Sequence, residues 1–291
     1  MIILTFFSEK GGVGKSSFTI LFASWLQKNF GVKVGVADFN ERIAAYRREE
    51  ISRREKLRKD NPDIPPFDQE NAWPIVTVRP GDIMALKKAG NQKPNATWLQ
   101  KQIRPGGPLA NRDIVLCDFP GSLSGMEFLD VAGLKMLNLI VIPTEMDAMT
   151  EKSTRKLHKI LGDNYKHCVF LNKANMNLAQ LKAKSREYVK LMSEAGYPML
   201  PDIISATDRM GTIDKVDNIR STFAYPSFEN DKDGRPKDLG LGNLFIDVMR
   251  LLTQTQDLPG TRKTDLSFVA GLTKTPDDRQ SPDSAFPEFT D

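Results

Sequence analysis

Near its start the chain reads Glu9-Lys10-Gly11-Gly12-Val13-Gly14-Lys15-Ser16-Ser17. An apolar run, residues 2–7, comes before this stretch, and an amphipathic segment, residues 18–30, follows it. A strand, a glycine-rich loop and a helix in this order form the context of a phosphate-binding loop. Glycines let backbone N–H groups converge on phosphate oxygens without Cβ clashes, and the helix adds the positive end of its dipole. The segment therefore predicts a phosphate site.

The polar side chains of this loop have expected roles. Lys15 is placed to reach the terminal phosphates of a nucleotide, and the Ser16 hydroxyl is placed to bind Mg²⁺. The remaining contacts to ATP would come from the loop itself: Gly11, Gly12, Val13, Gly14, Lys15, Ser16 and Ser17. The alternative is a glycine-rich turn without a catalytic role. The flanking strand and helix, and the presence of two lysines, favour nucleotide binding.

The loop departs from the plain pattern G-x-x-x-x-G-K-[ST], because Glu9 stands where that pattern has its first glycine. A second lysine, Lys10, precedes the glycine pair instead. This form, K-G-G-x-G-K-[ST], resembles the deviant P-loop of the ParA/MinD family of ATPases. The resemblance implies a P-loop NTPase fold of the α/β class, with a single doubly wound, mostly parallel sheet and helices on both faces. It also implies that Lys10 reaches across a dimer interface to the partner's nucleotide, so that ATP binding produces a homodimer.

The second predicted strand, residues 32–38, ends in Asp38, which matches the first acid of the family's D-x-D switch. Asn40 stands where the second acid would be. In the family that acid helps to place the attacking water and the Mg²⁺ shell, whereas an amide can hold a water but cannot take its proton. We therefore expect catalytic roles for Asp38 and Asn40, with hydrolysis that is slow or depends on a partner. The alternative is that our alignment is shifted by two residues.

A further apolar run, residues 114–117, ends in Asp118. A buried strand of this kind aims its terminal acid at the Mg²⁺ shell beside a phosphate loop, so Asp118 is predicted to be a catalytic residue and a metal ligand. Pro120 and Gly121 then resemble the family's second switch, whose backbone senses the γ-phosphate. The alternative is an ordinary strand that ends in a surface acid.

Asn172 follows another predicted strand, residues 167–171. In relatives the asparagine at this place hydrogen-bonds the adenine ring. The carboxyl end of a strand in an open α/β sheet lies at the binding crevice, which agrees with that role. A helix cap or a turn residue is the alternative.

The resemblance covers roughly residues 1–40, 111–175 and, more weakly, 195–255. We expect a ParA-like ATPase domain over residues 1–256 and an acidic, proline-rich, disordered tail over residues 257–291. Residues 41–110 read as a charged insertion. It would begin with a solvated helix, residues 41–60, continue with a strand, residues 73–78, and end with helical pieces near 83–88 and 97–103.

The net charge of +4 is unevenly distributed, because acids outnumber bases in residues 276–291 and leave a basic body. A basic body suits a polyanionic partner. Residues 213–226 resemble the part of the family that touches DNA. The DNA-binding candidates are Lys182, Lys184, Arg186, Lys190, Arg209, Lys215 and Arg220. A solvated surface is the alternative for each of them.

The composition, 40% hydrophobic and 27% charged, is that of an ordinary globular protein. No apolar run approaches the ~20 residues of a membrane span, and the first residues do not read as a signal peptide. Cys117 and Cys168 lie in apolar runs and are expected to be reduced core residues, so zinc and iron–sulfur chemistry are disfavoured. We expect a cytoplasmic protein that makes no contact with a membrane.

The resemblance, which is greatest to ParA-like proteins of bacterial plasmids and conjugative elements, implies an ATPase of DNA partition. ATP and Mg²⁺ would join two subunits, a joint basic surface would hold DNA nonspecifically, and a ParB-like adaptor would trigger hydrolysis. Two alternatives remain. Asn40 fits an ATP-locked scaffold with little turnover. A MinD-like membrane organiser is less favoured, because the acidic, proline-broken tail is not a basic amphipathic helix.

Overall fold

The computed structural model describes residues 1–63, 66–67, 72–121, 136–174, 179–205 and 241–253. Its strands are β1 (Ile2–Phe6), β2 (Val34–Asp38), β3 (Ile75–Thr77), β4 (Ile114–Asp118), β5 (Leu139–Thr144), β6 (His167–Ala174) and β7 (Met199–Ser205). Its helices are α1 (Lys15–Phe30), α2 (Arg42–Asp60), α3 (Pro80–Lys88), α4 (Pro94–Ile103), α6 (Ala148–Leu161), α7 (Ala179–Glu194) and α9 (Leu241–Thr253), with a 3₁₀ turn, η1, at Gly162–Asn164.

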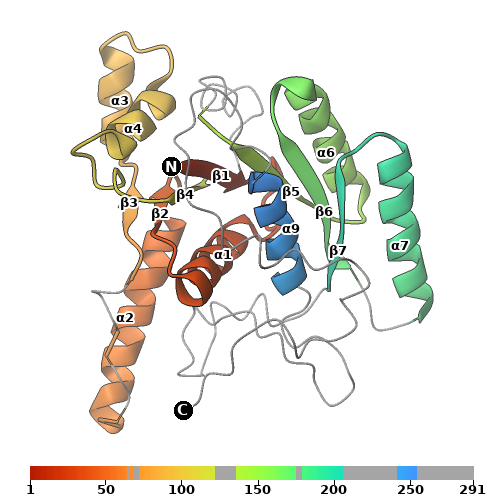
Figure 1. Ribbon diagram of the computed structural model, residues 1–291. Helices are drawn as coiled ribbons and strands as arrows, with labels where there is room; N and C mark the ends of the chain where they lie inside the picture. The colour runs from red at the N-terminus through yellow and green to blue at the C-terminus, as the bar shows by residue number, and fades with distance from the viewer. Residues whose placement is uncertain (64–65, 68–71, 122–135, 175–178, 206–240, 254–291) are drawn as a thin grey trace.

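The seven strands form one sheet in the order β3-β2-β4-β1-β5-β6-β7, and all neighbouring pairs are parallel (Figure 1). Strand β1 therefore lies at the centre, between β4 and β5. Parallel neighbours require crossover connections, which place helices over the sheet. The predicted fold class, a doubly wound α/β sheet, is confirmed.

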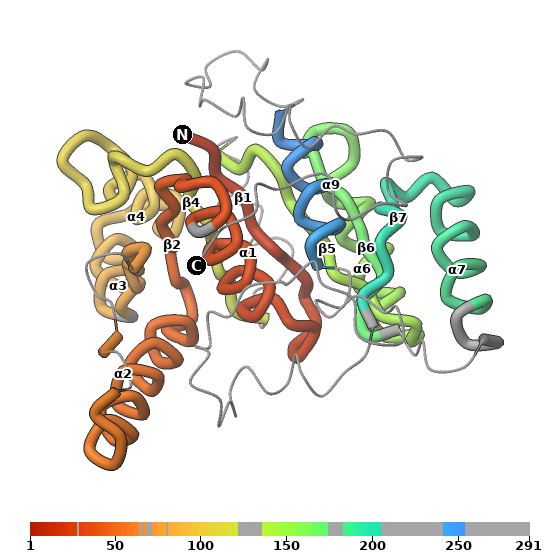
Figure 2. The backbone as a smooth tube through the Cα atoms, turned by 60° about the horizontal axis from the view of Figure 1, so that its bottom comes forward, coloured from red at the N-terminus to blue at the C-terminus, as the bar shows by residue number. Residues whose placement is uncertain are grey.

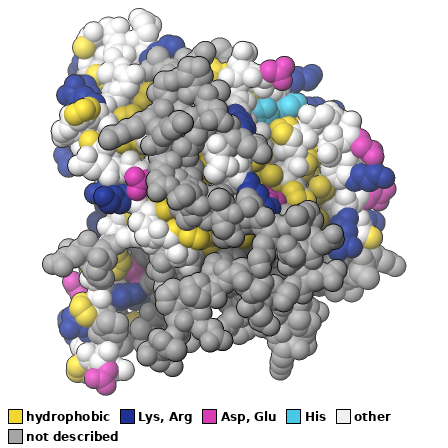
Figure 3. Space-filling view, in the orientation of Figure 1, with side chains coloured by type: hydrophobic (Ala, Val, Ile, Leu, Met, Phe, Trp, Pro, Cys, Tyr) yellow, Lys and Arg dark blue, Asp and Glu magenta, His cyan; other side chains and the backbone are white. Residues whose placement is uncertain are grey.

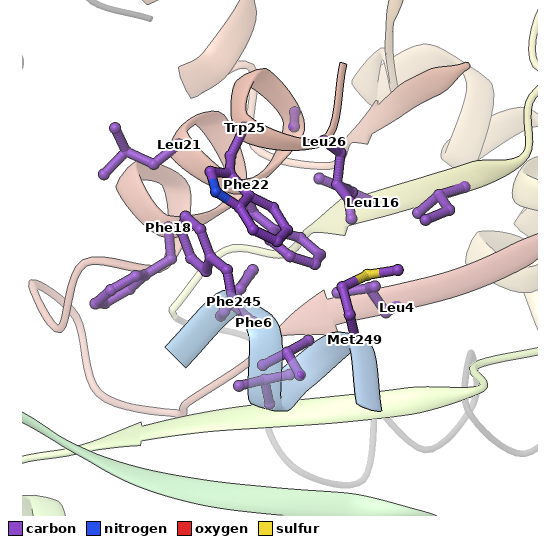
Figure 4. Close-up of a cluster of buried hydrophobic side chains, with 14 of the residues drawn as sticks. Leu4, Phe6, Phe18, Leu21, Phe22, Trp25, Leu26, Leu116, Phe245 and Met249 are labelled. Atoms are coloured by element: carbon purple, nitrogen blue, oxygen red, sulfur yellow. The ribbon is translucent and has the colours of Figure 1, made fainter. Parts of the chain in front are cut away.

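Two hydrophobic cores lie on opposite faces of the sheet. On one face α9 lies beside α1 (Figures 1 and 2), and Phe245 of α9 packs against Phe22 with ring centroids 4.9 Å apart. Figure 4 shows this cluster closing over β1 and β4. The second core receives Trp98, Leu99, Leu157 and Leu161 from α4 and α6. Coverage of both faces holds β1 and β4 rigidly, and the predicted site lies at their carboxyl ends.

Helix α2 differs from the solvated helix that the sequence predicts. Most of it is exposed, and Figures 1 and 2 show it extending away from the sheet. Glu50, however, is buried, and its two carboxylate oxygens each lie 2.7 Å from a guanidinium nitrogen, one of Arg53 and one of Arg54. A buried carboxylate requires such partners, so this part of α2 is packed rather than solvated.

The region predicted as an insertion contains α2, β3, α3 and α4, and β3 joins the sheet as an edge strand beside β2. Helices α3 and α4 begin earlier than predicted, at Pro80 and Pro94, because proline is well suited to the first turn of a helix. The predicted disordered tail lies outside the described residues, as does the segment 213–226.

Two further findings concern the cysteines and the lengths of the helices. Cys117 and Cys168 are buried free thiols, as predicted. Within the described ranges, no helix is long and apolar enough to cross a membrane.

Candidate functional site

The predicted phosphate loop connects β1 to α1. Gly12 and Gly14 have φ angles of 78° and 89°, in the left-handed region that residues with a Cβ rarely adopt. A Cβ on Gly14 would also lie 3.1 Å from a ring carbon of Phe18. Helix α1 has no acidic residue in its first turn, so the positive end of its dipole is left for an anion. The loop therefore has the backbone geometry of an anion site.

Lys15, the first residue of α1, is only 7% exposed. Its Nζ donates a hydrogen bond to the backbone oxygen of Lys10 at 2.7 Å. The pKa of Lys15 is lowered to about 8, mainly because the side chain is buried. Asp118 opposes this shift, and Arg42 adds to it. Burial destabilises the charged form of Lys15, so a negatively charged phosphate nearby would stabilise that form strongly.

The turn after β4 lies directly against the loop. A Cβ added to Gly121 would lie 3.0 Å from Nζ of Lys15 and 3.2 Å from Cα of Gly11, so a larger residue would require these neighbours to move by a few tenths of an ångström. The predicted second switch therefore contacts the phosphate loop, and its next residues, 122–135, lie outside the described part of the chain.

Asp118 lies at the end of β4, in register with Asp38 at the end of β2. Its Oδ2 accepts a hydrogen bond from Oγ of Ser16 at 2.8 Å, and its buried Oδ1 has no hydrogen-bond partner among the described residues. The pKa of Asp118 is raised to about 7, mainly because the side chain is buried. The Ser16 hydroxyl opposes this shift, and the Asp38 carboxylate adds to it. A hydroxyl and a carboxylate with an open oxygen form a hard oxygen donor set, which fits Mg²⁺.

The first predicted switch is held by its own backbone. The carboxylate of Asp38 accepts hydrogen bonds from the backbone N–H groups of Asn40 and Ala44, at 3.2 and 2.9 Å. Asn40 Oδ1 accepts from the N–H of Arg42 at 2.9 Å, and the side-chain amide of Asn40 lowers the pKa of Asp118. The amide therefore faces the candidate Mg²⁺ ligand, and its oxygen is committed to the start of α2. Glu41, which follows, has a left-handed φ of 61°.

Lys10 is bound within its own chain. Its Nζ lies 3.1 Å from Oε2 of Glu145, 2.8 Å from Oδ2 of Asp147 and 2.7 Å from Oγ1 of Thr150. The hydrogen bond to Asp147 contributes most to raising the pKa of Lys10, and Lys10 in turn holds the pKa of Asp147 well below its ordinary value. Asp147 is also the N-cap of α6, because its Oδ1 accepts from the N–H groups of Met149 and Thr150. In this structure Lys10 is held at the start of α6.

Sequence reasoning assigned no role to this group of partners. Glu145 and Asp147 directly follow β5, the other neighbour of β1. The available signal was the sheet order: carboxyl ends of adjacent parallel strands meet at one edge, so acids after β5 must lie near the loop after β1. That order could not be read from the sequence alone.

Asn172 is buried at the carboxyl end of β6, and its Nδ2 donates to the backbone oxygen of Val13 at 2.9 Å. The predicted adenine ligand therefore lies beside the phosphate loop and braces it. Contact with adenine remains a prediction, since the neighbouring residues 175–178 are outside the described part of the chain.

The DNA-binding candidates whose side chains the structure describes lie away from this site. Lys184, Arg186 and Lys190 are exposed on α7, at the far edge of the sheet. Lys190 lies 3.8 Å from Glu194, and Figure 3 shows acidic and basic side chains intermingled where α7 lies. Lys182 belongs to the same helix, and Arg209, Lys215 and Arg220 lie outside the described residues.

No model of a known protein family matches the chain, and no curated protein sequence matches it. Solved structures do match. A plasmid partition protein from Borrelia burgdorferi B31, solved with AMPPNP, has a TM-score of 0.54 and 18% identity, over 85% of this chain and 99% of that one.

Two further structures give similar values. MinD from Aquifex aeolicus has a TM-score of 0.52 and 15% identity, over 90% of this chain and 100% of that one. McdA from Cyanothece, solved with ATP, has a TM-score of 0.51 and 14% identity, over 90% of this chain and 98% of that one. At such identities the likeness establishes the fold alone: this chain has the fold of the ParA/MinD-type ATPases.

Proposed function

We propose that the protein is an ATPase that binds MgATP and dimerises around it. The observation that carries the proposal is the meeting of Lys15, Ser16 and Asp118 at one edge of the sheet, with a hydrogen bond between Ser16 and Asp118. Lys15 and the loop N–H groups would bind the phosphates, and Ser16 and Asp118 would hold Mg²⁺, which would neutralise charge on the phosphates. The structures of similar fold that were solved with AMPPNP and with ATP support this assignment.

Dimerisation is supported by the position of Lys10. Its side chain is 31% exposed and ends in a cluster of acceptors at the rim of the loop, so it can leave them without unfolding the core. A lysine that exchanges these acids for the phosphates of a second subunit's ATP would link nucleotide state to assembly. One similar fold, MinD, was solved together with its partner MinC, which supports a role for protein partners.

The cargo that we propose is DNA, held nonspecifically, in partition or maintenance of a mobile element, with a ParB-like adaptor as activator. The basic balance of the body and the exposed Lys184, Arg186 and Lys190 support a phosphate-binding surface. The protein would then act in the cytoplasm, on the nucleoid. Phosphate contacts release counterions, so affinity must fall steeply with salt.

The test is a binding titration on random-sequence duplex DNA with ATP, with ADP and without nucleotide, beside light scattering for the mass of the particle. DNA binding and dimer mass should both rise with ATP alone. Dimers that form with ATP but do not bind DNA would overturn the DNA-binding part of the proposal. They would favour the ATP-locked scaffold, which Asn40 also favours. Absence of ATP binding would overturn the whole proposal.

Asn40→Asp should raise the rate of ATP hydrolysis by about tenfold, because a carboxylate can accept a proton from the attacking water and an amide cannot. Asn40→Gln, which keeps an amide, is the matched control and should not be faster than wild type. Single-turnover hydrolysis measures the step itself. A rate for Asn40→Asp at or below that of wild type would show that Asn40 does not occupy the position of a base.

The affinity for MgATP should be greatest between the pKa of Asp118, about 7, and that of Lys15, about 8. Below this window Asp118 is protonated and must lose a proton to bind Mg²⁺; above it Lys15 is neutral and must gain one to bind phosphate. Affinity should therefore fall by up to about tenfold per pH unit on each side. Calorimetric titrations in two buffers of different ionisation enthalpy measure the protons exchanged. A flat affinity from pH 5.5 to 9.5 would contradict the linkage.

A further inference from the structure

Lys173 has an unusual backbone. It follows Asn172 near the end of β6, where the pairing with β7 shifts register, and its φ is 53°. A left-handed conformation is unfavourable for a residue with a Cβ and is found most often at functional sites. Among the described residues, the non-glycine residues with positive φ are Lys173 and Glu41, and both border the candidate site.

The side chain of Lys173 connects two parts of that site. Its Nζ donates to the backbone oxygen of Gly12 at 2.6 Å and lies 2.9 Å from Oε1 of Glu145. The other carboxylate oxygen of Glu145 is the one that binds Lys10. A single ammonium group therefore ties the phosphate loop to the carboxylate that also holds Lys10.

The hydrogen bond from Lys173 fixes the phosphate loop at Gly12. Gly12 is exposed, and a Cβ built on it would meet nothing within 4 Å, so little surrounds the loop at this position. The neighbouring carbonyls of Lys10 and Val13 are bound by Lys15 and Asn172. With Gly12 bound by Lys173, carbonyl groups of the loop are drawn toward side chains, which leaves N–H groups free to converge on an anion.

We propose that Lys173 is a positioning residue for the phosphates of the bound nucleotide, an inference that rests on the proposed function. Lys173 acts through the Gly12 carbonyl: it fixes the loop before the nucleotide arrives, so binding does not have to order it. The left-handed backbone of Lys173 coincides with the contact of its ammonium group with the loop. A lysine that only ended the strand would need no contact with either Gly12 or Glu145.

The test compares wild type with Lys173→Met, Lys173→Arg and Lys173→Gly, by titration with a fluorescent ATP analogue and by thermal unfolding. Lys156→Met is the matched control, because Lys156 is also exposed and pairs with Glu9 of the same loop, 3.2 Å away, but makes no hydrogen bond to a loop carbonyl among the described residues. Lys173→Met should bind ATP and ADP roughly tenfold more weakly, as expected for losing one charge-assisted hydrogen bond. Lys173→Arg should restore binding to within about threefold, because arginine can donate to the same oxygen.

Lys173→Gly separates positioning from stability. Glycine relieves the left-handed strain, so this variant should unfold at or above the wild-type temperature and still bind ATP as weakly as Lys173→Met. Equal ATP affinity for wild type and Lys173→Met, or an equal loss in Lys156→Met, would overturn the inference and leave the proposed function intact. A wild-type protein that binds no ATP would instead overturn the proposed function.

Discussion

Lys10→Ala should abolish ATP-dependent dimerisation and the hydrolysis that depends on it, while ATP affinity of the single subunit stays within about threefold of wild type. In the proposed dimer Lys10 leaves Glu145 and Asp147 for the partner's phosphates, so its loss removes a charge contact between subunits, an effect of about 2–5 kcal/mol at protein interfaces. Lys15 and the rest of the phosphate loop keep their contacts. Light scattering with and without ATP, together with nucleotide titration, measures both quantities.

Asp147→Asn tests the same idea in the opposite direction. Asparagine still caps α6, because its side-chain oxygen can accept from the N–H groups that Asp147 caps, but it has no charge to hold Lys10. Its dimers should form at lower ATP concentration than those of wild type. Dimers that form in Lys10→Ala as readily as in wild type would rule out an intersubunit role for Lys10.

Lys15→Met should weaken ATP binding severely and make the protein more stable. Since burial lowers the pKa of Lys15 from 10.5 to about 8, keeping this lysine charged in the folded protein at pH 7 costs about 3 kcal/mol. The lost hydrogen bond to Lys10 offsets about 1 kcal/mol of that gain, so the melting temperature should rise by roughly 2–6 °C. Loss of the phosphate contact should weaken ATP binding by at least about a hundredfold.

The pH dependence of unfolding identifies the cause. The folded state disfavours charged Lys15, so wild-type stability should rise as pH increases from about 8 toward 10.5, and the difference from Lys15→Met should shrink over that range. Ser17→Ala, in the same helix turn, is a control for general changes to the loop. A Lys15→Met protein that melts below wild type at pH 7 would contradict the burial argument.

Much of the fold could be predicted because buried parallel strands read as continuous apolar runs. The sequence shows such runs at residues 114–117 and 139–142, and these residues are buried in the structure. The burial of Glu50 in α2 could not be predicted, because nothing in the local sequence distinguishes Glu50 from its exposed neighbour Glu49. The predicted helices near 83–88 and 97–103 began too late, because they left out Pro80 and Pro94, which suit the first turn of a helix.

The candidate site also contains residues that the sequence could predict and residues that it could not. Lys15, Ser16 and Asp118 could be predicted because each lies in a local pattern with a fixed meaning, and the structure brings the three together. Glu145 and Lys173 carry no such pattern: their importance arises from the sheet order and from a left-handed backbone, neither of which short-range sequence encodes. The phosphate-loop motif therefore predicts the class of ligand, whereas the residues that hold the loop in place can be identified only from the fold.

The central position of β1 also governs how the chain can fold during synthesis. β1 is made first, but its partner Ile114 in β4 is 112 residues from Ile2, and its other neighbour, β5, is made later still. At ordinary rates of translation β1, which is buried along its whole length in the folded protein, waits roughly 6–22 s for its first partner. A parallel pairing of such long range also forms slowly once both strands exist. This protein should therefore leave the ribosome with a strong demand for chaperones, and its phosphate loop, although encoded first, should be among the last parts to become functional.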